Sequence, residues 1–153
     1  KRRFMKAKDI MTKDVLTVSL DTPVKKVAEL LADYEISGAP VLDEHEKVIG
    51  IVTESDLIEQ KKKLHLPTVV TIFEGVLFLE RPQKIQREIE KMLGATVKDI
   101  YTKKVITITE DTSLEDIATI MSEKKVHLLP VLRGNELVGI VGKVDVVRAL
   151  AKE

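Results

Sequence analysis

The stretch GIVTESD at residues 50–56 returns near the other end of the chain as GIVGKVD at residues 139–145. In each copy a glycine and the apolar pair Ile-Val precede four residues, of which the last is aspartate. A short β-branched run followed by polar residues predicts a strand that passes directly into a helix. The copies differ where that helix would begin, because Thr53 stands in the first and Gly142 in the second.

Similarity between the two parts of the chain extends beyond this stretch. Three further pairs of segments recur at one constant spacing: DIMT (9–12) with DIYT (99–102), VLTV (15–18) with VITI (105–108), and PVL (40–42) with PVL (130–132). Self-similarity of this kind is the signature of a duplicated structural unit. The chain is therefore predicted to consist of a first unit (1–60), an inter-repeat insert (61–95) and a second unit (96–153).

Each unit has the pattern of a β-α-β-β-α fold. Its first helix is predicted from apolar residues one helical turn apart, such as Val24, Val27 and Leu31. Thr22 and its counterpart Thr112 are the predicted N-caps of these helices. The other predicted elements are strands over 15–18, 39–42, 48–52, 105–108, 128–132 and 137–141, and helices that begin at Glu54 and Lys143. The predicted fold class is α/β (α+β), built from two pseudo-symmetric units.

The insert has a pattern of its own. Residues 67–79 (PTVVTIFEGVLFL) are rich in β-branched and aromatic residues, which predicts extended pairing or a flap. A helix is predicted between Pro82 and Gly94. Phe73 and Phe78 are interpreted as covers for an exposed end of the core rather than as ligand contacts.

The composition narrows the choice of partners and compartment. Among the 153 residues, 25 basic side chains balance 25 acidic ones, so no overall field recruits nucleic acid or an anionic membrane. Residues 61–63, three lysines, are interpreted as a solvated helix end, because no stacking aromatics accompany them. No apolar stretch is long enough to span a bilayer. The absence of cysteine excludes disulfides and makes a reducing cytoplasm the expected location.

Signals for catalysis are missing. The three histidines, His45, His65 and His127, lack the spacing of metal ligands, and no nucleophile elbow or glycine-rich phosphate loop occurs. The acidic residues are scattered among lysines, as on solvated helix faces. We therefore expect neither a catalytic residue nor a metal site, and we expect that the chain is not an enzyme.

The repeated junction itself admits two interpretations. Thr53 and Asp56 form nearly a capping box, with Thr53 as N-cap, and glycine in this place costs only a few tenths of a kcal/mol. The same junction could bind a ligand, because a helix N-terminus attracts phosphate and an aspartate can accept both hydroxyls of a ribose. Capping and binding both remain open on these residues alone.

Taken together, the two copies of these segments resemble a tandem pair of cystathionine-β-synthase (CBS) domains, the Bateman module. The resemblance covers nearly all of residues 6–59 and 96–151. It implies two units packed pseudo-symmetrically through their sheets, with two clefts between them. It also implies flat homodimers and the binding of adenosine compounds, namely AMP, ADP, ATP or S-adenosylmethionine.

Carried over position by position, the resemblance implies contacts in both clefts. In the first, Asp56 would hold the ribose hydroxyls, Thr53 would hold a phosphate, and Thr17 would lie against the sugar or phosphate. The backbone of Gly38 and Ala39 would face the adenine edge. The residues implied for the first cleft are Thr17, Ser37, Gly38, Ala39, Pro40, Thr53 and Asp56. Those implied for the second are Thr107, His127, Leu128, Leu129, Pro130, Lys143 and Asp145.

Gly142 departs from the Thr or Ser that the family pattern has before its aspartate. Loss of this hydroxyl hardly weakens a cap but changes how phosphate is held. We therefore expect two unequal sites, with the Thr53 cleft the more typical one. His127 is as well explained by packing as by binding, and Lys143 is either a phosphate contact or a solvated lysine.

Two functions follow from the resemblance. The first is a regulatory, non-catalytic module that senses an adenosine compound, requires no other cofactor, and acts on an effector protein in trans. The second is a dimerisation scaffold whose clefts are vestigial. The Thr53 copy of the junction favours the first function, whereas Gly142 favours the second for one cleft.

Overall fold

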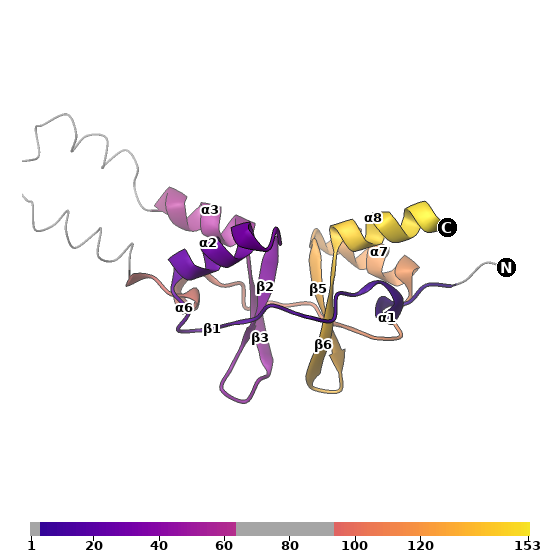
Figure 1. Cartoon of the computed structure of the whole chain (residues 1–153), viewed down its shortest axis with the longest axis horizontal. Helices are drawn as coiled ribbons and strands as arrows, with labels where there is room; N and C mark the ends of the chain where they lie inside the picture. Colours follow the sequence, from indigo (N-terminus) through magenta and orange to yellow (C-terminus); the bar gives the residue numbers. More distant parts are fainter. Residues whose placement is uncertain (1–3, 64–93) are drawn as a thin grey trace, which may run out of the picture.

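Two similar halves lie side by side in the molecule (Figure 1). The computed structural model describes residues 4–63 and 94–153. Each half has one three-stranded sheet, in the order β1-β2-β3 or β4-β5-β6. The hairpins β2–β3 and β5–β6 are adjacent at the centre, and the longer helices lie farther out (Figure 1). The predicted fold class is thus confirmed.

Apart from one short helix at the start of each repeat, which the pattern did not predict, the described elements follow the predicted order, although the first strand of each repeat is shorter than predicted. In the first half, β1 (Val18–Ser19) is parallel to β2 (Gly38–Leu42), which is antiparallel to β3 (Val48–Thr53). The helices of the first repeat are α1 (Ala7–Ile10), α2 (Val24–Asp33) and α3 (Glu54–Lys63). The second repeat contains α6 (Val97–Ile100), β4 (Ile108–Thr109), α7 (Leu114–Lys124), β5 (Leu128–Arg133), β6 (Glu136–Gly142) and α8 (Lys143–Lys152).

Periodicity explains which face each long helix buries. In α2 the apolar side chains Val27 and Leu31, one turn apart, are buried, and α7 buries Leu114, Ile117 and Met121 in the same way. The predicted starts of α3 and α8, Glu54 and Lys143, are confirmed. Each half therefore builds its core between a sheet and a helical face that the sequence pattern predicts.

The predicted N-caps of α2 and α7 are wrong by one residue. Helix α7 is capped by Ser113, whose hydroxyl accepts a hydrogen bond from the Asp116 N–H at 3.1 Å. The hydroxyl of Thr112 instead accepts from the N–H of Thr109, at 3.0 Å. This threonine closes the turn after a strand that is only two residues long. Thr22 acts likewise on Ser19, and Pro23 occupies the N-cap position of α2.

The two repeats exchange their short first helices. Helix α1 packs on the second half, where Ala7 is fully buried in the core and its N–H donates to the Thr112 carbonyl at 2.8 Å. Helix α6 packs on the first half, where Val97 is fully buried and its N–H donates to the Thr22 carbonyl at 2.9 Å. Each core is therefore completed by the other repeat, so neither repeat holds a complete core of its own.

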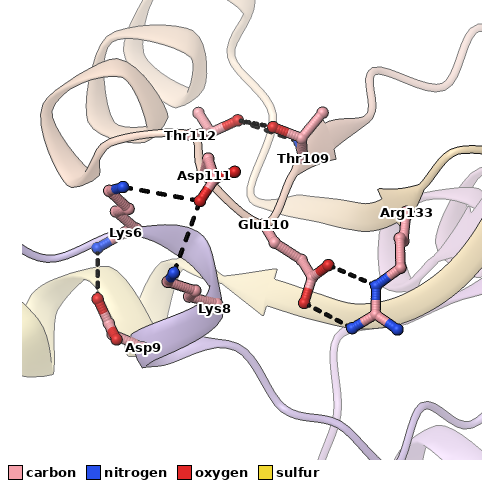
Figure 2. Close-up of polar contacts among 8 residues, drawn as sticks. All are labelled: Lys6, Lys8, Asp9, Thr109, Glu110, Asp111, Thr112 and Arg133. Atoms are coloured by element: carbon pink, nitrogen blue, oxygen red, sulfur yellow. Dashed lines mark hydrogen bonds and ion pairs between the residues drawn. The ribbon is translucent and has the colours of Figure 1, made fainter.

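Charged groups surround the attachment of α1 to the second half (Figure 2). The ammonium groups of Lys6 and Lys8 both lie 3.6 Å from a carboxylate oxygen of Asp111. Next to them, Glu110 accepts two hydrogen bonds from the Arg133 guanidinium, at 2.7 and 3.0 Å. Exposed ion pairs add little stability, so we expect burial of Ala7 and its apolar neighbours, together with the backbone hydrogen bonds, to contribute more to this attachment.

Glu110 gives the protein an acid-sensitive contact. Its hydrogen bonds from Arg133 hold the pKa of Glu110 below its ordinary value. Desolvation opposes this shift, and the charge of the guanidinium adds to it. A carboxyl whose pKa is lowered by folding stabilises the protein above the unfolded pKa, about 4.3 for glutamate, and loses that contribution as the pH falls through the folded pKa.

We predict that Glu110→Gln loses less stability than the native protein when the pH is lowered from about 5 to 3. The measurement is the melting temperature as a function of pH, with an exposed glutamate of α7, Glu123, replaced in the same way as control. Identical acid slopes for the native protein and Glu110→Gln would contradict this account.

Several sequence predictions fall on the insert. The extended segment 67–79, the helix expected from Pro82, the side chains of Phe73 and Phe78, and His65 lie outside the described residues. Within the described ranges, no helix combines the length and the apolar character that crossing a bilayer requires.

Candidate ligand-binding cleft

The junction at Thr53 forms the predicted capping box. The Thr53 N–H donates to Asp56 Oδ2 at 2.9 Å, and the Asp56 N–H donates to the Thr53 hydroxyl at 3.4 Å. The Thr53 hydroxyl also donates to Asp56 Oδ2, at 3.2 Å. Both side chains are partly buried. Capping therefore engages Thr53 and one oxygen of Asp56 in this structure.

Only the carboxylate half of this arrangement exists at the second junction. The Gly142 N–H donates to Asp145 Oδ2 at 2.8 Å, and glycine offers no hydroxyl in return. Among the residues that the structure describes, no other hydrogen bond to the Asp145 carboxylate is formed. Asp145 is partly buried. Its Oδ1 is thus available as an acceptor beside a helix N-terminus.

A cleft of about 1270 Å³ opens at Asp145. Both repeats line it, the first with Thr12, Leu16, Tyr34, Ile36, Ser37, Gly38 and Glu54, and the second with His127, Leu128, Gly142, Lys143, Val144, Asp145 and Arg148 among others. Concave sites lined by both halves of a protein are common places for small ligands.

Two close approaches of the backbone shape this cleft. The strands β2 and β5 begin side by side, because a Cβ atom on Gly38 would lie 3.0 Å from Leu128 Cδ2. The same atom would lie 2.7 Å from the carbonyl oxygen of Val52 in β3, so only glycine fits here. The segment after α1 remains on the second half, where Thr12 and Ile140 exchange backbone hydrogen bonds of 2.9 and 3.0 Å. Residues from distant parts of the chain are thereby brought around Asp145.

The cleft joins residues that the sequence assigned to different sites. Ser37 and Gly38 were expected beside Asp56, yet they line the cleft that also contains His127, Lys143 and Asp145. The sequence repeat identifies equivalent residues in the two halves. It does not show which surfaces of the two halves face each other, so it could not show this mixed lining.

Other predicted residues lie elsewhere. The side chains of Ala39, Pro40, Leu129 and Pro130 are fully buried in the cores, so only their backbone could contact a ligand. Thr17 lines a separate hollow of about 630 Å³ near the hairpin turns, together with His45 and Arg133. Thr107 is exposed on the surface.

Charges of both signs surround the cleft. Lys13, Lys143 and Arg148 face Asp14, Glu35, Glu54 and Asp145. The Lys143 N–H donates to the His127 carbonyl at 2.9 Å, which holds these two residues together. Groups of three or more His, Asp or Glu that could bind a metal are absent from residues 4–63 and 94–153.

Sequence reasoning missed several lining residues. Thr12, Lys13 and Arg148 were not among the candidates, although all three line the cleft. Thr12 carried a usable signal, because it recurs as Thr102 in the repeated DIMT and DIYT segments. Arg148 has no counterpart of the same type in the first repeat and gave no such signal.

Comparison with known proteins places these features in a family. The family model described as "CBS domain" matches residues 7–63 and again residues 97–152. The uncharacterised protein MJ1426 of Methanocaldococcus jannaschii is 34% identical, over 96% of this chain and 92% of its own. The chloroplastic CBS domain-containing protein CBSX1 of Arabidopsis thaliana is 32% identical, over 92% of this chain and 62% of its own.

Some relatives are much longer than the region they share with this chain. An inosine-5'-monophosphate dehydrogenase of Methanocaldococcus jannaschii is 30% identical over 94% of this chain, but the match spans only 23% of that enzyme. The similarity is thus to one part of these proteins.

Solved structures show the same fold. CBSX2 in a complex with AMP superimposes with a TM-score of 0.71 at 27% identity, covering 96% of each chain. The CBS domain pair of protein MJ0100 has a TM-score of 0.73 at 24% identity, covering 98% of each chain. The architecture of the two halves is therefore shared with pairs of such domains.

Proposed function

The chain belongs to the CBS domain family, and we propose from that premise that it is a regulatory, non-catalytic module that binds an adenosine compound in the cleft at Asp145. The observation that carries the proposal is the open carboxylate oxygen of Asp145 at the N-terminus of α8, within a cleft lined by both repeats. The AMP complex of CBSX2, a relative with the same fold, supports an adenosine ligand.

The cleft offers a partner for each part of such a ligand. Asp145 Oδ1 can accept hydrogen bonds from the ribose hydroxyls while Oδ2 continues to cap α8. The N-terminus of α8 favours an anion, Lys143 can add positive charge beside a phosphate, and the His127 ring can offer a hydrogen-bond donor. Gly38 lies against the Leu128 side chain at the cleft, and the backbone groups of these two residues are the proposed partners of the adenine edge.

The hydrogen bonds favour the Asp145 cleft over the Asp56 site, whereas the sequence favoured the junction at Thr53. In the first junction Asp56 is occupied by internal hydrogen bonds, and Thr53 is engaged in the cap. In the second junction the missing hydroxyl of Gly142 leaves the aspartate less engaged. We therefore place the stronger of two unequal sites at Asp145.

Regulation would arise from the shared lining of the cleft. A ligand that contacts both repeats binds best to one relative position of the halves and shifts the population toward it. The effector that reads this change is proposed to be a protein that acts in trans. The proposed contacts between the cleft and its ligand do not depend on which protein this effector is.

We further propose that two copies pair through the outer helices. One face of α8 carries exposed apolar residues, since more than half of the surface of each of Val144, Val147 and Leu150 is exposed. Ile58 of α3 is 71% exposed. Exposed apolar stripes of this kind mark interaction surfaces. The homodimer that the family resemblance implies would cover them.

We predict that Val147→Glu converts the dimer into a monomer, because two carboxylates would be buried without partners in a two-fold interface. Sedimentation equilibrium measures the change. Ser122→Glu, at an exposed position of α7, is the matched control and should remain dimeric. A dimer that persists in Val147→Glu would place the interface on another surface.

Calorimetric titration tests the proposed function. Nucleotide-free protein is titrated with AMP, ADP, ATP and S-adenosylmethionine in turn. Saturable binding of at least one of them is expected, and the order of affinities identifies the ligand class. If none binds at millimolar concentration, the proposal fails and a dimerisation scaffold with vestigial clefts becomes the better account.

A further inference from the structure

The Asp56 carboxylate is bound on both of its oxygens. Oδ2 accepts from the N–H and the hydroxyl of Thr53, and Oδ1 accepts from the hydroxyl of Thr102 at 3.0 Å. Thr102 comes from the second repeat and follows α6, the short helix that completes the first core. Asp56 Oδ1 corresponds to the open Oδ1 of Asp145. It already accepts a hydrogen bond from a residue that is distant in the sequence.

Thr102 is held in place by its backbone rather than by this bond. Its N–H donates to the Ile51 carbonyl at 2.8 Å, and its carbonyl accepts from the Ile51 N–H at 2.9 Å. Gly50 permits this approach, because a side chain there would lie 2.6 Å from the Thr102 carbonyl oxygen. The hydroxyl can thus turn away about χ1 while the backbone pairing stays intact.

The second half contains the same frame without the side-chain bond. Thr12 pairs with Ile140 through two backbone hydrogen bonds, as Thr102 pairs with Ile51. Thr12 also lines the cleft beside Asp145, yet within the described part of the chain its hydroxyl forms no hydrogen bond with that carboxylate. The two junctions therefore share this backbone pairing and differ in the side-chain contacts to their aspartates, the Thr102 hydroxyl among them.

We propose that the Thr102 hydroxyl is an internal competitor for ligand at Asp56. It donates to Asp56 in the manner of a ribose hydroxyl, so a diol reaches this carboxylate only after Thr102 has turned away. The Asp56 junction is then a second, weaker adenosine site, filled after the Asp145 cleft. This inference rests on the proposed function and assigns an order of occupancy to its two sites.

The direct test is calorimetry with AMP as the probe. Thr102→Val removes the hydroxyl at nearly constant volume and should tighten the weaker site about fivefold or more, because a hydrogen bond to a charged acceptor no longer has to be broken. Thr102→Ser keeps a hydroxyl and should behave like the native protein. Adding Asp56→Ala to Thr102→Val should remove the tightened site, which assigns it to that junction.

Two outcomes overturn the inference while leaving the proposed function intact. One is an unchanged weaker site in Thr102→Val with normal binding at Asp145. The other is an equal gain in Thr102→Ser, which would mean that the hydroxyl is not the competing group. Absence of AMP binding in the native protein and in all variants would instead overturn both proposals. Thermal unfolding checks that each variant is folded.

Discussion

Asp145→Ala should weaken AMP binding about 100-fold, the largest effect on binding that we expect from one substitution. Hydrogen bonds to a charged acceptor contribute about 1.5–3 kcal/mol each, so loss of two ribose contacts removes roughly 3 kcal/mol, which corresponds to about two powers of ten in Kd. The measurement is calorimetric titration of the native protein and the variant under identical salt.

The control must separate binding from helix capping. Asp145 also caps α8, and loss of such a cap costs about 1 kcal/mol of folding stability. Asp99 provides the matched case, since its Oδ2 accepts from the Thr96 N–H at 2.9 Å at the start of α6. Asp99→Ala should lower the melting temperature to a similar degree and leave AMP affinity near native. Native affinity in Asp145→Ala would remove Asp145 from the site.

Val97→Asp should destabilise the whole protein by about 4 kcal/mol or more, the largest effect on folding. Val97 is fully buried in the first core, and an unpaired buried charge costs several kcal/mol. Because this residue belongs to the second repeat, the damage should appear in the half formed mainly by the first. Chemical denaturation followed by circular dichroism measures the free energy of unfolding.

Lys98→Asp is the matched control for Val97→Asp. Lys98 is the next residue of α6 and is exposed, so the same new charge remains in water. Its effect should stay within about 0.5 kcal/mol, as for most surface substitutions. If Val97→Asp were equally mild, the exchange of short helices between the repeats would not hold the cores together.

The sequence predicted the long elements well because their signals are local. The repeated GIVTESD and GIVGKVD stretches contain β-branched runs and polar helix starts, and both junctions lie where those patterns change. The caps at Thr22 and Thr112 failed because threonine also closes turns after strands, and residue type alone does not distinguish the two roles.

Two features depended on tertiary structure and could not be read from the repeat. Helices α1 and α6 have four residues each, too few to show an apolar period, so their exchange between halves left no trace in the sequence. The lining of the Asp145 cleft mixes Ser37 and Gly38 with His127 and Lys143, and only the packing of the halves brings them together.

A crystal structure of the protein grown with AMP tests the central claim most directly. We predict AMP in the cleft between the repeats, with its ribose hydroxyls within hydrogen-bond distance of Asp145 Oδ1 and its phosphate near the N-terminus of α8. AMP bound only at Asp56, or only on a surface away from both aspartates, would contradict the account.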